Sequence, residues 1–315
     1  MLYEGGEMAA GKLDANDHSV TGMRIVFLTD ERFGSAEDFK YMFANVAALF
    51  RDVHIVAVRR SQAEQKPFSL PGLYRKIRKI SKKARRFGLM YTFETVTSYP
   101  LQLFILRRHW QEVDERLRAL PRPPKQPRPE TVTYVDTLNS PDAVKTVSRL
   151  EPDVLIQLNA GILKRQIFEI PPLGTLNLHP GIAPLIRGVH SIHWALWEQK
   201  PEWIGATLLY IDEGIDTGPV LAYAPVDLRS PGERFPSLFV RATERGVQCL
   251  ADSLYHIERG KRWVIDPPQG ERVYRSYLPG WRLGLLEIRL ALRRWAAPLG
   301  ESGKPRSTDP RKALR

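Results

Sequence analysis

The chain of 315 residues is long enough for one large domain or two ordinary ones, and its 43% hydrophobic and 26% charged residues are usual for a folded protein. This composition excludes a wholly disordered chain, and no apolar run approaches the roughly 20 residues of a membrane-spanning helix. The net charge of +12 is concentrated in two segments. Residues 72–128 carry 15 Lys and Arg against 4 acids, and residues 281–315 carry 9 against 3, which leaves the remainder at −5.

This distribution argues against a nucleic-acid-binding core and for a local anionic contact such as a phosphate group, RNA or a lipid surface. Basic helices that only present solvated faces are the alternative interpretation. Cys249 is the single cysteine, so no disulfide forms within the chain and a reducing cytoplasm is the expected compartment. Residues 1–22 mix acids with glycines and contain no apolar stretch, which predicts a flexible leader and excludes a secretory signal.

The first predicted elements are a strand, a helix and a second strand. Residues 24–29 and 53–58 are short apolar runs rich in β-forming side chains, and residues 36–50 place apolar side chains at helical spacing. This alternation is typical of an α/β fold.

Residues 72–128 interrupt the alternation and are expected to form a basic helical insertion. Two helices are predicted, around 73–87 and 101–119, and a proline-rich stretch at 121–129 ends the insertion. The first helix carries an apolar stripe among its basic residues. Such a pattern fits a helix on a membrane surface, although a stripe packed on the core is the commoner explanation.

The alternation then resumes and continues toward the carboxyl end. Strands are predicted at 131–135, 153–158, 174–178 and 205–211, and helices at 140–150, 190–199 and 233–258. Residues 263–265 and 272–277 are expected to form a small hairpin, followed by a basic amphipathic helix at 281–295 and a disordered tail at 300–315.

Three side chains with catalytic chemistry lie near the end of the strand at 174–178. Asn177 and His179 are two residues apart and leave the same face of a strand, at the carboxyl end where open α/β sheets bind ligands. A loop with two glycines and three acids, including Asp216, follows about 40 residues later. An amide and an imidazolium stabilise an oxyanion, and a carboxylate tunes the imidazole, so the set suits acyl transfer.

Other candidate sites are weaker. His190 and His193 have the i, i+3 spacing of a metal pair, but no third ligand lies at sensible spacing, so a structural or acceptor-side place is favoured. Trp194, Trp197 and Trp203 are expected to pack in the core. The first strand is not followed by Gly-x-Gly-x-x-Gly, which makes a nicotinamide cofactor an unfavoured interpretation.

The motifs around these residues form a recognisable series between residues 153 and 225. In order they read Gly174-Thr-Leu-Asn-Leu-His-Pro-Gly-Ile-Ala-Pro-Leu-Ile-Arg-Gly188, Trp194-Ala-Leu-Trp197, Gly205-Ala-Thr207 and Asp212-Glu-Gly-Ile-Asp-Thr-Gly-Pro219. This series resembles the folate-dependent formyltransferase family, which includes glycinamide ribonucleotide formyltransferase, methionyl-tRNA formyltransferase and sugar N-formyltransferases. The family often has Ser-Leu-Leu-Pro where this chain has Gly181-Ile-Ala-Pro184, a difference in the loop that faces the acceptor.

The resemblance implies catalytic roles for Asn177, His179 and Asp216 and a formyl donor, 10-formyltetrahydrofolate, with no metal. It also implies a set of donor-binding and acceptor-side residues. Donor contacts fall on Leu158, Asn159, Ala160, Gly161, Ile162, Leu163, Asp212 and Gly214, and acceptor-side contacts on Arg187, Gly188 and His190.

The expected fold is a Rossmann-like, open and mostly parallel sheet. Residues 23–225 are expected to form the catalytic domain, 226–280 a carboxyl-terminal helix and hairpin, and 281–315 a basic helix with a tail. The leading interpretation is an N-formyltransferase acting on a small anionic amine, with an amino sugar on a nucleotide or a similar anionic metabolite as the first candidate.

Three alternatives remain open. Methionyl-tRNA is the second acceptor: the basic segments favour it, whereas residues 226–315 offer too few strands for the carboxyl-terminal barrel typical of that branch. A hydrolase that deformylates the folate is another. The third is a non-catalytic folate- or nucleotide-binding protein held at a membrane by residues 73–87 and 281–295.

Overall fold

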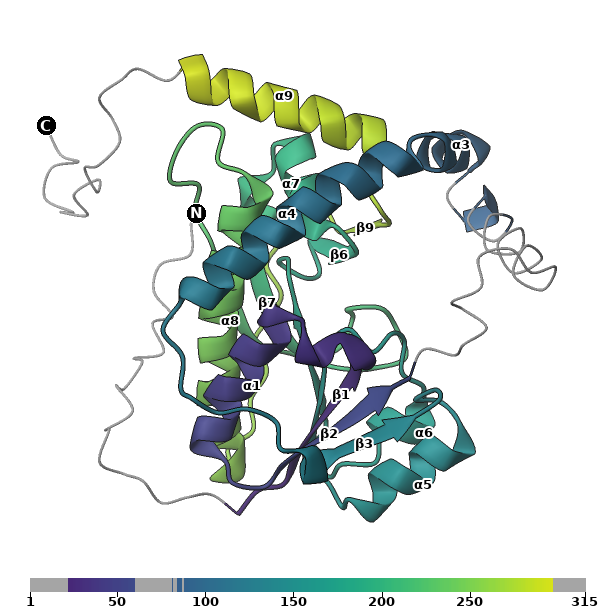
Figure 1. The fold of residues 1–315 in the computed structure, drawn as a ribbon, viewed down its shortest axis with the longest axis vertical. Helices are drawn as coiled ribbons and strands as arrows, with labels where there is room; N and C mark the ends of the chain where they lie inside the picture. The colour runs from purple at the N-terminus through teal and green to yellow at the C-terminus, as the bar shows by residue number, and fades with distance from the viewer. Residues whose placement is uncertain (1–21, 60–80, 82–83, 87, 297–315) are drawn as a thin grey trace, which may run out of the picture.

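Seven strands form one sheet in the computed structural model, which describes residues 22–59, 81, 84–86 and 88–296 (Figure 1). In spatial order the strands are β3 (Val132–Val135), β2 (Val53–Val58), β1 (Ile25–Asp30), β4 (Val154–Gln157), β5 (Thr175–His179), β7 (Gly205–Tyr210) and β8 (Val220–Pro225). The first five are mutually parallel, whereas β7 is antiparallel to β5 and β8 is antiparallel to β7. The predicted α/β, mostly parallel fold is therefore confirmed.

Alternate side chains of the central strands enter two different hydrophobic cores. Ile25 and Phe27 of β1 pack into the larger core with α1 (Glu37–Leu49) and α8 (Phe235–Glu258). Val26 and Leu28 face the other way, toward α5 (Pro141–Arg149) and α6 (Arg165–Phe168). Because successive strand residues point to opposite faces, helices on both sides bury the sheet.

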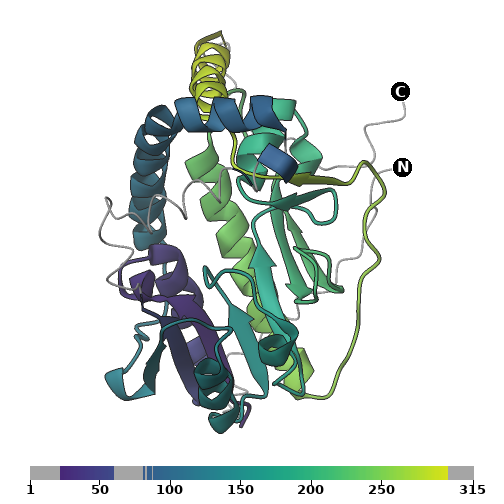
Figure 2. The same cartoon turned by 90° about the vertical axis from the view of Figure 1, so that its right-hand side faces the viewer.

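A second group of helices lies beyond one end of the sheet (Figures 1 and 2). It contains α3 (Leu89–Thr97), α4 (Tyr99–Ala119), α7 (Ser191–Glu198) and α9 (Gly280–Ala296). Helix α9 packs along α4 and also contacts α3 and α7, while α4 continues down to α1 and α8. Helices α4 and α9, the main described parts of the two basic segments, thus lie side by side.

The predicted hairpin is wrong. Ile265 instead forms a single bridge with Val220, and β9 (Val273–Arg275) pairs in parallel with β6 (Ile186–Gly188) in a separate two-stranded sheet. Both segments have β-forming composition, but strand pairing is decided by tertiary contacts that composition does not carry. Strands β6 and β8 and helix α3 were not predicted from the sequence.

The remaining described elements are short 3-10 helices. They are η1 (Glu31–Gly34), η3 (Pro129–Thr131) and η4 (Pro201–Trp203). Most of the predicted helix at 73–87, the leader up to residue 21 and the tail at 300–315 lie outside the described residues. Among the helices that the structure does describe, none has the length and apolar character needed to span a membrane.

Candidate active site

The end of β5 presents an amide and an imidazole on the same face, next to two neighbouring strands. Asn177 lies opposite Gln157 of β4 and Leu209 of β7, and His179 lies opposite Thr207. The His179 residue is only 3% exposed. A polar ring so deeply buried requires hydrogen-bond partners within the protein.

Asp216 supplies one of these partners and joins the three side chains. Its Oδ1 accepts a hydrogen bond from Asn177 Nδ2 at 3.2 Å, and its Oδ2 lies 3.4 Å from His179 Nδ1. The backbone N–H of Gly188 donates to the same Oδ2 at 3.0 Å. The structure therefore brings together the three residues that the sequence analysis selected, although Asn177 and Asp216 are 39 positions apart in the chain.

The loop between β7 and β8 is folded so that Asp216 reaches β5. The Oδ1 of Asp212 accepts hydrogen bonds from Gly214 N at 2.9 Å and from Thr217 Oγ1 at 2.6 Å, which closes a turn that contains Asp216. Asp216 itself has a φ of +52°, a left-handed conformation that few side chains other than Asn and Asp tolerate. An aspartate here thus serves the turn as well as the site.

The second ring nitrogen of His179 faces the protein interior. His179 Nε2 lies 3.2 Å from the Ile186 carbonyl oxygen and 3.3 Å from Ser191 Oγ. With a carboxylate at Nδ1 and a carbonyl at Nε2, both N–H groups of a protonated ring have acceptors. A Cβ at Gly181 would lie 2.9 Å from His179 Nε2, so only glycine fits beside the ring.

Ser191 and the Ile186 carbonyl were missed by the sequence analysis. Ser191 is the first residue of α7, and Ile186 begins β6, a strand that was not predicted. A helix beginning at a serine shortly after the catalytic loop was the one available signal.

The expected donor-binding turn follows β4 directly and lies beside this cluster. Asn159 and Gly161 adopt φ of +60° and +82°, and the turn leaves Ile162 70% exposed. Asn139 fixes the turn, because its Nδ2 donates to the Ile162 carbonyl and its Oδ1 accepts from Lys164 N, both at 2.8 Å. Asn139 was not selected from the sequence.

Two further contacts tie this turn to its surroundings. Arg165 forms an ion pair with Glu213 at 2.9 Å, which joins the turn's far end to the loop that carries Asp216. Asn159 Nδ2 lies 3.4 Å from Asp38 Oδ2, and burial raises the pKa of the Asp38 carboxyl. Leu163 is buried in the core with α5 and α6 and does not line the exposed turn.

The expected acceptor-side residues divide into two groups. Arg187 reaches the loop, with Nη1 3.5 Å from the Ile215 carbonyl, and its buried Nε has no hydrogen-bond partner among the described residues. Gly188 has a φ of +97° and lies against the Arg275 carbonyl. His190 points away from the cluster, because its Nδ1 accepts from Leu278 N at 3.2 Å and its ring lies against Tyr277.

The His190 and His193 pair is not assembled for a metal. His193 is 1% exposed, stacks on Phe235 and lies 3.2 Å from His109. Within the described part of the chain, no group of three or more His, Cys, Asp or Glu side chains could hold a metal ion.

Comparison with known proteins decides the family of the segment that contains this cluster. Residues 107–252 match the family described as "Formyl transferase". This segment belongs to the folate-dependent formyltransferase family.

Similar proteins match over part of their length. A methionyl-tRNA formyltransferase of Chloroflexus aggregans is 39% identical over 131 residues, which cover 41% of this chain and 42% of that protein. One from Kosmotoga olearia is 32% identical over 161 residues, or 50% and 51% of the two chains. The chain thus spans about two fifths to half of the length of these relatives. A sugar N-formyltransferase structure from Shewanella sp. is 14% identical, with a TM-score of 0.48 over 85% of this chain and 87% of that one.

Proposed function

We propose that this protein transfers a formyl group from 10-formyltetrahydrofolate to a primary amine. The observation that carries the proposal is the contact among Asn177, His179 and Asp216 at the carboxyl end of β5. These residues lie within the segment that belongs to the formyltransferase family. An amide, an imidazole and a carboxylate in contact are a suitable set for acyl transfer.

The turn at 158–163 fits the donor. Its exposed apolar side chain, Ile162, follows β4 closely, and Gln157 at the end of β4 is paired with Asn177 of the catalytic cluster. The turn is held in one conformation, because Gln157 donates to the Gly161 carbonyl and Asn139 to the Ile162 carbonyl. The residues of the turn would hold the donor's ring, with Asp212 and Gly214 on the opposite side.

The donor supplies a formyl group whose oxygen gains negative charge as the amine attacks. Asn177 commits one amide N–H to Asp216, and its second N–H is the donor we assign to that oxygen. One preorganised donor of this kind contributes about 10²–10³ in rate.

His179 and Asp216 act on charge and protons. Asp216 Oδ2 and the Ile186 carbonyl oxygen lie next to the two ring nitrogens of His179, so the imidazole is held in one orientation beside the reacting group. Asp216 is 11% exposed at its side chain, and the Gly188 N–H fixes its orientation. We assign it the uptake of the amine proton, directly or through water. The bond between the formyl carbon and the donor nitrogen then breaks, and that nitrogen gains a proton as tetrahydrofolate leaves.

For the acceptor, we propose an amino sugar carried on a nucleotide or a similar anionic metabolite. Arg187 supports an anionic acceptor, because its buried Nε is without a hydrogen-bond partner in the described residues and lies beside the loop that carries Asp216. A guanidinium with a spare donor suits a phosphate oxygen.

Methionyl-tRNA is the second candidate acceptor. The relatives that are 39% and 32% identical to this chain are methionyl-tRNA formyltransferases, and they favour it. Phosphate contacts to tRNA would also draw on the basic segments of the chain.

The test is calorimetric titration of the full chain with a non-hydrolysable analogue of 10-formyltetrahydrofolate, followed by a formyl-transfer assay. We expect micromolar binding by the native protein. Asp216→Asn keeps the size of the side chain, so it should retain binding and lose about 10²–10³ in transfer rate. Asp266→Asn, an exposed site away from the cluster, is the matched control and should change neither.

The acceptor is decided in the same assay. Transfer to an amino-sugar nucleotide supports the proposal, and transfer to methionyl-tRNA alone replaces it with the second candidate. A folded native chain that does not bind the analogue contradicts the formyltransferase proposal itself.

A further inference from the structure

Large apolar side chains gather on the outer surface of three helices. Of the 20 large apolar side chains exposed among the described residues, 13 lie on α3, the first turns of α4 and α9. They are Leu89, Met90, Phe93, Val96, Tyr99, Leu101, Leu103, Phe104, Trp281, Leu285, Ile288, Leu292 and Trp295, and we call this set the apolar face. Single exposed apolar residues are usual on proteins, whereas a group of this size on three helices that contact one another marks an interaction surface.

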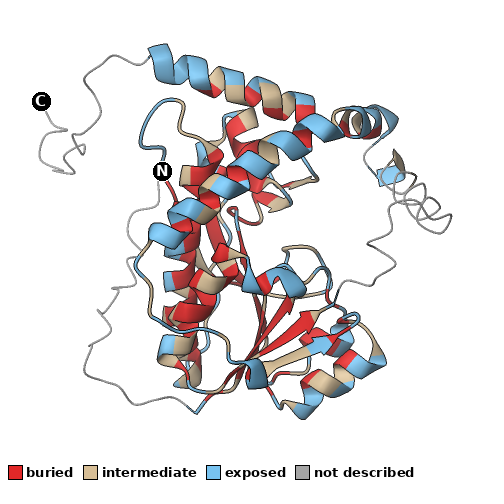
Figure 3. Cartoon of the chain, viewed as in Figure 1, coloured by how far each residue is buried: buried red, intermediate tan, exposed pale blue. Residues whose placement is uncertain are grey.

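Helix α9 shows the exposed apolar surface most clearly, because it has one buried and one exposed apolar stripe. Leu283, Leu286 and Leu290 are at most 3% exposed and form the stripe that packs on the rest of the protein. The second stripe repeats every three or four residues from Trp281 to Trp295 and stays exposed, with Trp295 87% exposed. Figure 3 shows the outer side of α9 and of α3 in the colour of exposed residues. A helix with two apolar stripes buries one within the protein and offers the other to a partner.

The residues around the apolar face are strongly basic. The described parts of residues 84–110 and 280–296 expose six arginines, namely Arg85, Arg86, Arg107, Arg108, Arg293 and Arg294. The acids in these ranges are Glu94 and Glu287, and both are neutralised. Glu94 pairs with Arg282 at 3.1 Å, and Glu287 pairs with Arg234 at 2.8 Å. The face therefore carries a net positive charge toward any partner.

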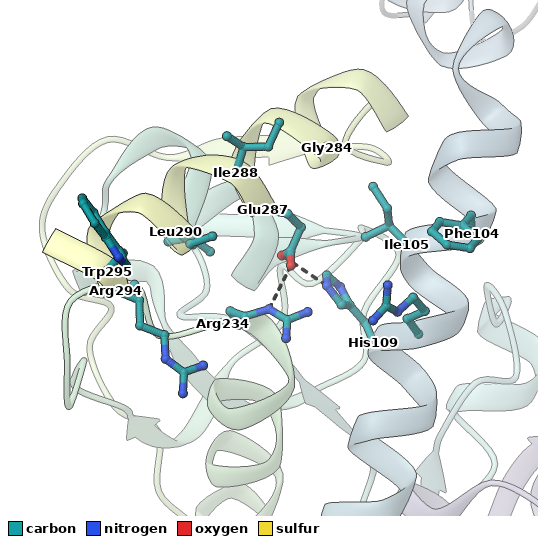
Figure 4. Close-up of a pocket in the computed structure, with 13 residues that line it drawn as sticks. Phe104, Ile105, His109, Arg234, Gly284, Glu287, Ile288, Leu290, Arg294 and Trp295 are labelled. Atoms are coloured by element: carbon teal, nitrogen blue, oxygen red, sulfur yellow. Dashed lines mark hydrogen bonds and ion pairs between the residues drawn. The ribbon is translucent and has the colours of Figure 1, made fainter. Parts of the chain in front are cut away.

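A groove of about 890 Å³ between α4 and α9 opens within this surface (Figure 4). Phe104, Ile288 and Trp295 give it an apolar lining, and Arg108 and Arg294 line it as well. In Figure 4, Glu287 points toward His109 and Arg234, so the acid of the groove is turned to partners within the protein. Apolar side chains beside exposed cations match the boundary between acyl chains and anionic head groups.

We propose that the apolar face docks on the surface of an anionic lipid bilayer. Leucine, isoleucine and tryptophan side chains of α9 and α3 would enter the interface, and the six arginines would contact lipid phosphates. Charge argues against a second copy of the chain, because two such surfaces would place their arginines together. The exposed apolar side chains argue against nucleic acid, because phosphate recognition does not need exposed leucines and isoleucines. The inference does not depend on the proposed formyl transfer.

Vesicle flotation of the full chain tests the proposal. We expect the native protein to float with phosphatidylcholine vesicles that contain phosphatidylglycerol at low salt. It should not float with phosphatidylcholine alone, and high salt should weaken the binding because it screens the arginines. A blue shift of tryptophan fluorescence should accompany binding and should diminish in Trp295→Phe.

Two variants and one control separate docking from folding. Ile288→Ser should weaken binding to anionic vesicles by about tenfold, because a 58% exposed side chain would otherwise leave water on docking. Arg293→Glu combined with Arg294→Glu should remove the preference for anionic lipid. Val264→Ser, which changes a side chain 64% exposed outside the apolar face, should bind as the native protein does.

Three results would overturn the proposal. The first is a folded native chain that stays unbound with anionic vesicles at low salt. The second is binding that Ile288→Ser leaves unchanged. The third is a dimer in solution that Ile288→Ser dissociates, which would assign the face to a second copy.

Discussion

Burial of the His193 ring makes the stability of the protein depend on pH, which the sequence alone does not predict. The ring centroid lies 3.9 Å from that of Phe235, and burial lowers the His193 pKa well below 6.5, with the charges of His190 and His109 acting in the same direction. Below about pH 6.5 the unfolded chain takes up a proton at this residue and the folded chain does not. The stability that neutral His193 allows is thus present above pH 6.5 and is lost as the pH falls.

Replacing His193 tests this behaviour. In His193→Leu, the unfolding free energy should fall less steeply between about pH 6.5 and pH 5, by up to about 1.4 kcal/mol for each pH unit. The comparison uses slopes, so a constant cost from the lost contact to His109 cancels. Glu287, which contacts His109, has a pKa lowered from 4.5. Its contribution to the unfolding free energy is therefore lost below pH 4.5, outside the range of this comparison. Denaturant unfolding across the range measures both slopes, and equal slopes would contradict the assignment.

The candidate site was partly predictable at this scale. Strand alternation alone places Asn177 and His179 on one face, because their spacing is local. Asp216 came from a family motif, since no local rule connects a loop residue to a strand 39 positions earlier. Ser191 and the Ile186 carbonyl were missed because their contact with His179 depends on how the loop after β5 folds back.

At the scale of elements, β6 and β9 meet where a glycine is required. Gly188 has a φ of +97°, and a Cβ there would overlap the Arg275 carbonyl of β9. Gly260 has a φ of +75°, and no atom lies within 4 Å of an added Cβ. Both glycines therefore need a left-handed backbone, but only Gly188 also lacks room for a Cβ.

This pair gives a matched prediction. Gly260→Ala should cost about 1 kcal/mol, the usual penalty for a left-handed alanine. Gly188→Ala should cost about 2–4 kcal/mol, because the added methyl must also separate β6 from β9. Guanidinium unfolding measures both. Equal costs for the two variants would mean that β6 and β9 are not held as closely as the structure shows.

The elements differ in how far the sequence predicts them. The helices at 36–50 and 233–258 were predicted because each carries a continuous apolar stripe along its own length. The β6–β9 pairing was not predicted, since each strand has only three residues and the paired residues are 87 positions apart in the chain. Short strands of this kind have no periodicity long enough to detect.

At the scale of the whole molecule, one core extends beyond the segment that matches the family. The larger core includes Met23 and Ile25 before residue 107 and Leu283, Leu286 and Leu290 after residue 252. Helix α9 is therefore packed as an integral part of the fold. The positions of the basic segments can be read from the sequence. The contact between α4 and α9 was not predicted, because it joins residues almost 180 positions apart.

Two adjacent leucines of α9 separate this packing from the proposed docking. Leu286 is fully buried, and Leu285 is 49% exposed on the apolar face. Leu286→Ala should lower the unfolding free energy by about 2–5 kcal/mol, because it leaves a cavity in the shared core. Leu285→Ala should change it by less than about 0.5 kcal/mol.

Binding to anionic vesicles should show the reverse order. Leu285→Ala should weaken it, while Leu286→Ala, assayed at a temperature where it remains folded, should bind as the native protein does. Unfolding in guanidinium and flotation on the same preparations give the four values. If Leu286→Ala is as stable as the native chain, α9 is not packed into the core as described. If instead Leu285→Ala binds vesicles unchanged, the exposed stripe does not enter the bilayer.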